Sequence, residues 1–175
     1  KEESVNTILE MAEYKKTGTC KILIVTGCMA QRYKEEITEE IPEVDAVLGT
    51  TSYGDIVKAL NEAEAGHVFQ EFKDINALPE DSGRRVITTG GHFGYLKIAE
   101  GCDKHCTYCI IPSLRGKFRS VPEERLLKQA EYMASQGVRE LILVAQETTV
   151  YGTDLYGKKT LHILLKKLCQ IKGIR

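Results

Sequence analysis

Three cysteines lie within eight consecutive residues, Cys102, Cys106 and Cys109, with the spacing C-x3-C-x2-C. Soft thiolates in such a set bind zinc, copper(I) or iron–sulfur clusters. A structural zinc ion normally has four protein ligands, and the nearest fourth candidate, His105, lies inside the run, where its neighbours crowd it. Three thiolates on a cubane of four irons leave one iron open for a further ligand. The spacing therefore favours a 4Fe–4S cluster over zinc, and either metal over three free cysteines packed in a core.

The other three cysteines are scattered along the chain. Cys28 follows an apolar, strand-like run and precedes a helical pattern, the position at which α/β folds place ligands. Such a position also favours a thiolate. Cys20 and Cys169 have no such setting, and we interpret both as packing residues. No secretory signal opens the chain, so we expect metal or redox chemistry in the reducing cytoplasm rather than a disulfide framework.

The composition excludes several classes of protein. The 24 basic and 25 acidic residues give a net charge of −1, so no global positive field indicates nucleic-acid binding. The hydrophobic fraction of 42% argues against disorder, and no apolar run approaches the roughly 18 residues of a membrane span. The chain opens at Lys1 rather than Met, and we expect it to continue beyond its printed ends.

Apolar periodicity positions the candidate ligands on an α/β framework. In the first part of the chain, short β-branched runs bounded by glycine alternate with helical stripes, which predicts a parallel sheet. The expected elements are a helix from Val5 to about Gly18, a strand over 21–26, a helix over 30–41 ended by Pro42, a strand over 44–48 and a helix around 56–60.

The second part of the chain repeats the alternation. The expected elements are a strand over 95–99, a long loop over 101–121 that holds the three cysteines, a helix through 126–133 that ends at Gly137, a strand over 141–145 and a helix over 161–168. Ser120 and Glu123 fit a capping box for the first of these helices. We therefore predict one domain over 1–74, a linker over 75–92 with a short strand at Val86-Ile87, and a second domain over 93–175. The second domain supplies only the first β/α units of an array whose complete barrel needs roughly 250 residues.

The cysteine loop, with Tyr108 directly before its third cysteine, resembles the radical S-adenosylmethionine superfamily. The resemblance implies that Cys102, Cys106 and Cys109 hold a 4Fe–4S cluster and that S-adenosylmethionine chelates its fourth iron. Cleavage of the sulfonium then gives a 5′-deoxyadenosyl radical. The stretches 95–102 and 110–116 are similar to the methylthiotransferases, the MiaB/RimO family, within that superfamily.

The first domain is similar to the same family in the stretches 27–33 and 41–49. In the family's N-terminal domain three cysteines hold an auxiliary 4Fe–4S cluster concerned with sulfur delivery, and Cys28 matches the third. The resemblance thus implies a methylthiotransferase N-terminal domain without its start over 1–74 and a truncated radical S-adenosylmethionine core, a partial TIM barrel, over 93–175. It also implies two clusters in the intact protein and one in this chain.

The resemblance implies insertion of a methylthio group into an unactivated C–H bond. Ser113-Leu114 and the stretch 146–152 favour the branch that modifies an aspartate β-carbon of small-subunit ribosomal protein twelve. The branch that modifies tRNA adenosines stays open as an alternative, and so does a non-catalytic zinc or iron–sulfur scaffold. Tyr108, Gln146 and Glu147 are the candidates for contact with S-adenosylmethionine. No catalytic side chain, sulfur donor or electron donor is identified.

Overall fold

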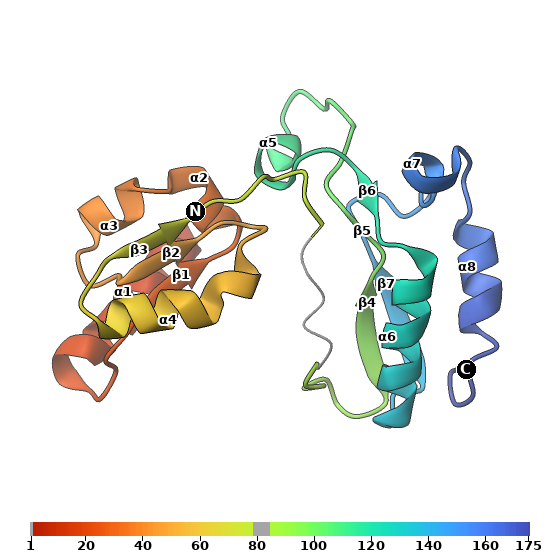
Figure 1. Cartoon of the computed structure of the whole chain (residues 1–175), viewed down its shortest axis with the longest axis horizontal. Coiled ribbons are helices and arrows are strands. Elements are labelled where there is room, and N and C mark those ends of the chain that lie inside the picture. The colour runs from red at the N-terminus through yellow and green to blue at the C-terminus, as the bar shows by residue number, and fades with distance from the viewer. Residues whose placement is uncertain (1, 79–84) are drawn as a thin grey trace. The chain divides into compact units, whose positions relative to one another are not determined.

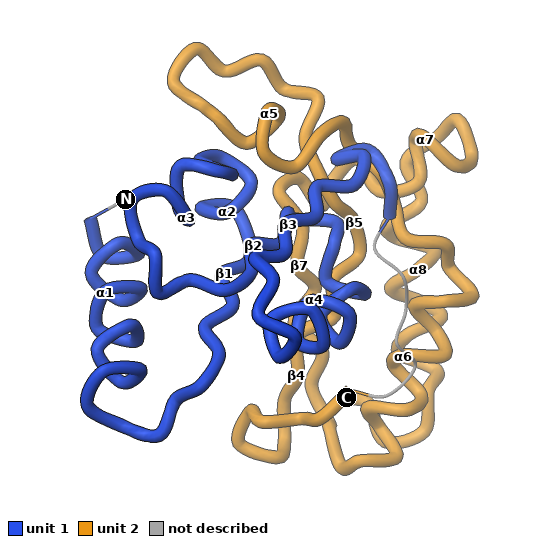
Figure 2. Tube along the Cα trace, turned by 60° about the vertical axis from the view of Figure 1, so that its left-hand side comes forward, with its two compact units in different colours: residues 1–80 blue, residues 81–175 orange. Residues whose placement is uncertain are grey.

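The computed structural model describes residues 2–78 and 85–175 of the chain, which forms two compact units over 1–80 and 81–175 (Figure 2). The described part of the chain has no helix with the length and apolar character needed to cross a bilayer. A mixed α/β fold with parallel strands was expected and is confirmed. The domain limits over 1–74 and 93–175 stay predictions.

The first unit is a parallel three-stranded sheet in the order β1-β2-β3 with helices on both faces (Figure 1). Its elements are α1 Glu2–Thr17, β1 Ile24–Thr26, α2 Cys28–Tyr33, α3 Glu36–Glu40, β2 Ala46–Leu48, the 3-10 turn η1 Tyr53–Asp55, α4 Ile56–Glu64 and β3 Phe69–Glu71. Val25 and Val47 pack with the helices α1, α2 and α3, whereas Ala46 and Leu48 pack with α4. Alternate residues of each strand therefore pack into two separate cores, one on each face of the sheet, as the continuous apolar runs predicted.

Two predictions in this unit were wrong in detail. The single helix expected over 30–41 is divided into α2 and α3 at Lys34, whose φ of 43° interrupts the helical ladder. Ile37 and Ile41 still reach the core, because the apolar spacing reports which side chains are buried and not whether the backbone is continuous. Strand β3 was not predicted, since its half-buried residues carry little apolar signal and depend on pairing with β2.

The second unit contains a parallel pair, β4 and β7, and an antiparallel pair, β5 and β6. Its elements are β4 Phe93–Lys97, β5 Ala99–Glu100, α5 Ile111–Arg115, β6 Arg119–Ser120, α6 Glu123–Ser135, β7 Glu140–Val144, α7 Thr153–Tyr156 and α8 Leu161–Leu168. Leu96 of β4 is fully buried, as are Leu126 and Ala130 of α6 and Leu164 of α8. The β–α–β order and the terminal helix confirm the predicted alternation.

Four details of this unit differ from the prediction. The expected strand over 95–99 begins at Phe93 and divides into β4 and β5, and the expected loop over 101–121 contains α5 and β6. Val86-Ile87 is irregular rather than a strand, and Val86 is 85% exposed. The capping box does not form: the N-cap of α6 is Pro122, and the hydroxyl of Ser120 donates to Asp154 instead, at 2.6 Å.

Candidate functional site

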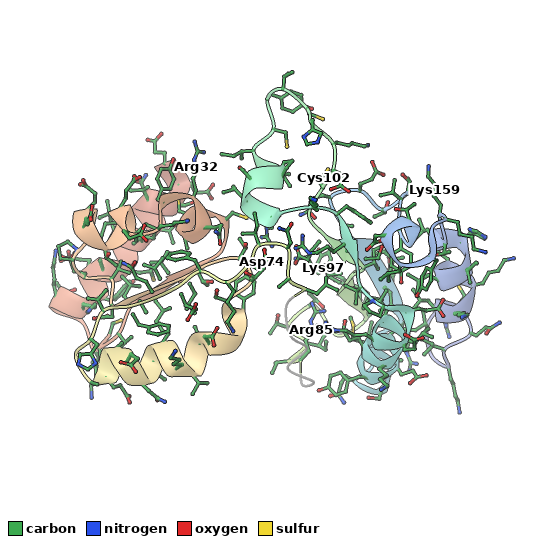
Figure 3. The ribbon with its side chains drawn as sticks, turned by 45° about the horizontal axis from the view of Figure 1, so that its top comes forward. Arg32, Asp74, Arg85, Lys97, Cys102 and Lys159 are labelled. Atoms are coloured by element: carbon green, nitrogen blue, oxygen red, sulfur yellow. The ribbon has the colours of Figure 1, made fainter. Side chains whose placement is uncertain are left out.

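The cysteine loop, residues 101–118, leaves β5 and returns through α5 to β6. Its two ends are joined by hydrogen bonds. The backbone N–H of Cys102 donates to the carbonyl of Gly116 at 3.1 Å, and the N–H of Phe118 donates to Oδ1 of Asp103 at 2.9 Å. The loop is thus closed at its base, and Figure 3 shows its tip projecting away from the strands of its unit.

Gly101 is required at the start of the loop. Its φ of +72° lies in the left-handed region that glycine tolerates. A Cβ atom there would lie 2.0 Å from the carbonyl oxygen of Lys117 and 2.5 Å from that of Gly116. The two ends of the loop can therefore approach this closely only if residue 101 has no side chain.

The donor chemistry of the loop fits an iron–sulfur cluster. All six cysteines of the chain are thiols rather than disulfides. Cys102 and Cys109 are half-buried, Cys106 is exposed, and a turn with a bond from Cys109 N to Cys106 O at 3.0 Å joins two of them. Within residues 2–78 and 85–175, no three Cys, His, Asp or Glu side chains are arranged around a common metal position. The structure thus places the three thiols on one loop and does not gather them into a ligand set.

The other residues of the loop tip point to solvent. Tyr108 is 90% exposed, so it is not a core residue, and its ring is accessible to a ligand. His105 is exposed as well. The contact of Tyr108 with S-adenosylmethionine stays a prediction.

Lys104 of the cysteine loop contacts the loop that follows β7. Its Nζ contacts Oε2 of Glu147, while Oε1 of Glu147 accepts the N–H and the hydroxyl of Thr149, at 3.2 and 2.5 Å. The bond from Lys104, followed by those from Thr149, lowers the pKa of Glu147 from 4.5 to about 2. Gln146 is exposed beside it. The role of Lys104 was missed, because its partner lies 43 residues away in the sequence.

Arg115 pairs with the buried carboxylate of Glu100. Glu100 was not singled out from the sequence. The signal that could have found it is its position: a carboxylate at the end of an apolar strand must have a charged partner if it is buried.

Cys28 begins α2 directly after β1, as predicted, at the edge of the sheet where the parallel strands end. Gln31 of the same helix is buried and accepts the backbone N–H of Thr50 at 3.0 Å, which ties α2 to the loop after β2. Cys28 belongs to the first unit and the cysteine loop to the second.

Cys20 is half-buried, with its thiol donating to the carbonyl of Ile22 at 3.5 Å, whereas Cys169 is exposed and does not pack as expected.

Two separate stretches of the chain match known protein families. Residues 96–175 match the Radical SAM superfamily, and residues 1–49 match the uncharacterized protein family UPF0004. The chain is 64% identical over 174 residues to the ribosomal protein uS12 methylthiotransferase RimO of Lachnoclostridium phytofermentans. It is 51% identical to the proteins of the same name from Clostridium botulinum strain Eklund 17B and Clostridioides difficile. These matches cover 99 to 100% of the chain, which spans about 40% of the length of each relative.

Proposed function

We propose that this chain is the cluster-binding part of a methylthiotransferase that acts on ribosomal protein uS12. The premise is that residues 96–175 belong to the Radical SAM superfamily and residues 1–49 to family UPF0004. One observation carries the proposal. The identity of 64% to a protein named for that activity extends over 99% of the chain, including the cysteine loop and the stretch that follows β7.

Cys102, Cys106 and Cys109 would hold the 4Fe–4S cluster, which leaves one iron for S-adenosylmethionine. Together these groups supply the electron and the radical that activate a C–H bond. The chain's own residues hold and orient them. The hydrogen bond that closes the base of the loop holds the start of the cysteine segment in place. The exposed ring of Tyr108 offers a stacking surface for the adenine.

Gln146 and Glu147 follow the carboxyl end of β7, the edge at which β/α barrels build their sites. The contact of Glu147 with Lys104 brings this segment to the cysteine loop. We propose that one of these two side chains contacts S-adenosylmethionine. Gln146 is the better candidate of the two, because its amide is exposed while the carboxylate of Glu147 is engaged by Lys104 and Thr149.

Cys28 is proposed as a ligand of a second, auxiliary 4Fe–4S cluster concerned with sulfur delivery. Its support is the family match over 1–49 and its position at the carboxyl edge of the first sheet. A cluster there needs thiols beyond those of the described unit, which offers Cys20 and Cys28. The chain by itself is therefore proposed to hold one cluster and to lack methylthiolation activity.

The proposed substrate is the aspartate β-carbon of uS12, in the cytoplasm where ribosomes work. The names of the relatives support uS12 as the substrate, whereas the choice of the aspartate β-carbon rests on the resemblance described above. The net charge of −1 gives no support to a tRNA substrate. The alternatives are separated by one assay. Protein from the complete gene, reconstituted without oxygen with iron and sulfide, is incubated with a chemical reductant, S-adenosylmethionine and either uS12 or tRNA, and the products are analysed by mass spectrometry.

We expect a mass increase of one methylthio group on the aspartate of uS12, and none when Cys106→Ala replaces the wild type. Modification of tRNA alone would contradict the proposal and favour the tRNA branch. A colourless protein that binds zinc and no iron would favour a scaffold.

A further inference from the structure

Glu100 is a buried carboxylate directly before the cysteine loop. It is the last residue of β5, and its side chain is only 5% exposed. Each carboxylate oxygen has a cation: Nζ of Lys97 contacts Oε1, and Nη1 of Arg115 lies 3.5 Å from Oε2. A buried charge is tolerated only with partners of this kind, so the position of Glu100 determines where Arg115 must lie.

Arg115 is the last residue of α5, on the returning side of the loop. Arg119, which faces Glu100 in the β5–β6 ladder, donates from Nη2 to the carbonyl of Arg115 at 3.0 Å and from Nη1 to that of Lys117. The residues on either side of Gly116 are thus fixed by one guanidinium, while the carbonyl of Gly116 itself accepts the N–H of Cys102. Glu100 and Arg115 are therefore the charged part of the link between the outgoing and returning ends of the loop.

We infer that Glu100 and Arg115 are a positioning pair that closes the base of the cysteine loop and so fixes the position of Cys102 relative to Cys106 and Cys109. The inference rests on the proposed function, in which these three thiols hold one cluster. The guanidinium suits the task because its planar, fixed donors lose little freedom when they pair with a carboxylate. Neither side chain is assigned a contact with the cluster or with substrate.

The first measurement uses the full chain without metal. Glu100→Gln and Arg115→Gln are each expected to accelerate amide hydrogen exchange at Cys102 and Phe118 by about tenfold, because a hydrogen bond to a charged group is lost at a buried site. Combined, the two changes should be no worse than either alone, and Glu100→Asp should restore part of the protection. Glu123→Gln is the matched control, since Glu123 pairs with Lys167 in the same unit without touching the loop. It should leave both amides unchanged.

The second measurement loads the same proteins with iron and sulfide without oxygen. The wild type is expected to hold about four irons per chain. Glu100→Gln and Arg115→Gln should hold fewer, and the reduced protein should show an altered electron paramagnetic resonance spectrum, whereas Glu123→Gln should match the wild type in both.

Unchanged exchange at Cys102 and Phe118 in both variants would overturn the inference. So would faster exchange combined with wild-type iron content and spectrum, because the pair would then support the fold alone. A wild type that binds no cluster is a separate result that overturns the proposed function. In that case the control variant Glu123→Gln would bind no cluster either.

Discussion

Nζ of Lys104 contacts Oε2 of Glu147, so the cysteine loop and the loop after β7 are joined across 43 residues of sequence. An ion pair with one exposed partner contributes little to global stability, and the Lys104 side chain is 62% exposed. Its importance is local. The pair connects the segment that carries the proposed cluster ligands to the segment that carries the proposed S-adenosylmethionine contacts.

The titration of Glu147 tests this connection. We expect a midpoint near its pKa of about 2, measured by carbon NMR of the side-chain carboxylate in the metal-free chain. The folded-state pKa is depressed, so the stabilisation is complete above the ordinary value of 4.5 and is lost as the pH falls towards 2. Lys104→Met should raise the pKa of Glu147, though not fully to 4.5, because the bonds from Thr149 remain. Lys158→Met, at an exposed position of the same unit, should leave it unchanged. A midpoint near 4.5 in the wild type would contradict the contact.

Gly101→Ala should strongly destabilise the second unit. The added Cβ meets the carbonyl of Lys117, and φ is positive, so we expect a loss of roughly 3 to 5 kcal/mol from backbone strain and a forced shift of the loop. Gly157→Ala is the matched control, because its φ is +68° but its Cβ would meet nothing within 4 Å. Strain alone should cost about 1 to 2 kcal/mol there. Urea unfolding measures both, and equal losses would argue against the tight closure of the loop base.

These contacts also indicate which parts of the structure could be predicted from the sequence. Helices α6 and α8 were predicted because their apolar residues recur with a helical period and include fully buried side chains such as Leu126 and Leu164. Strands β4 and β7 were predicted because their short runs are rich in apolar residues. The C-x3-C-x2-C spacing likewise identified the candidate ligands, since their chemistry is local to one loop.

The features that the sequence did not predict correctly depend on contacts between residues that are distant in the sequence or paired across strands. Strand β3 depends on the β2 ladder, which no local pattern of Phe69–Glu71 reveals. Ser120 and Glu123 have the spacing of a capping box, yet Asp154, 34 residues away, binds the hydroxyl of Ser120. Glu100 was overlooked for the same reason, because its partner Arg115 lies on the far side of the loop.

Ser120→Ala should loosen the junction of β6 with α7. The hydroxyl of Ser120 donates to Asp154 and accepts the N–H of Gly152 at 2.9 Å, and it is buried. Its removal leaves buried polar groups with fewer partners, so we expect a loss of about 1 to 3 kcal/mol in the free energy of unfolding. Ser135→Ala, whose exposed hydroxyl bonds to Tyr132, should change that free energy by less than about 0.5 kcal/mol. Equal effects of the two substitutions would mean that the Ser120 network contributes nothing to stability.

The iron content of the chain tests the assignment of its cysteines. We expect about four irons per chain after anaerobic reconstitution, the content of a single cubane. Alanine in place of Cys102, Cys106 or Cys109 should abolish the cluster absorbance, because two thiolates and an open iron do not retain a cubane.

Cys28→Ala should leave iron and absorbance unchanged in this chain. The first unit contains only Cys20 and Cys28, and the thiol of Cys20 is directed to the carbonyl of Ile22, so no three thiols are available there. Cys169→Ala, at an exposed position outside both candidate sites, controls for the loss of a thiol as such. A content near eight irons per chain, or a loss of iron in Cys28→Ala, would show that the first unit completes a cluster of its own and that the ligand count is wrong.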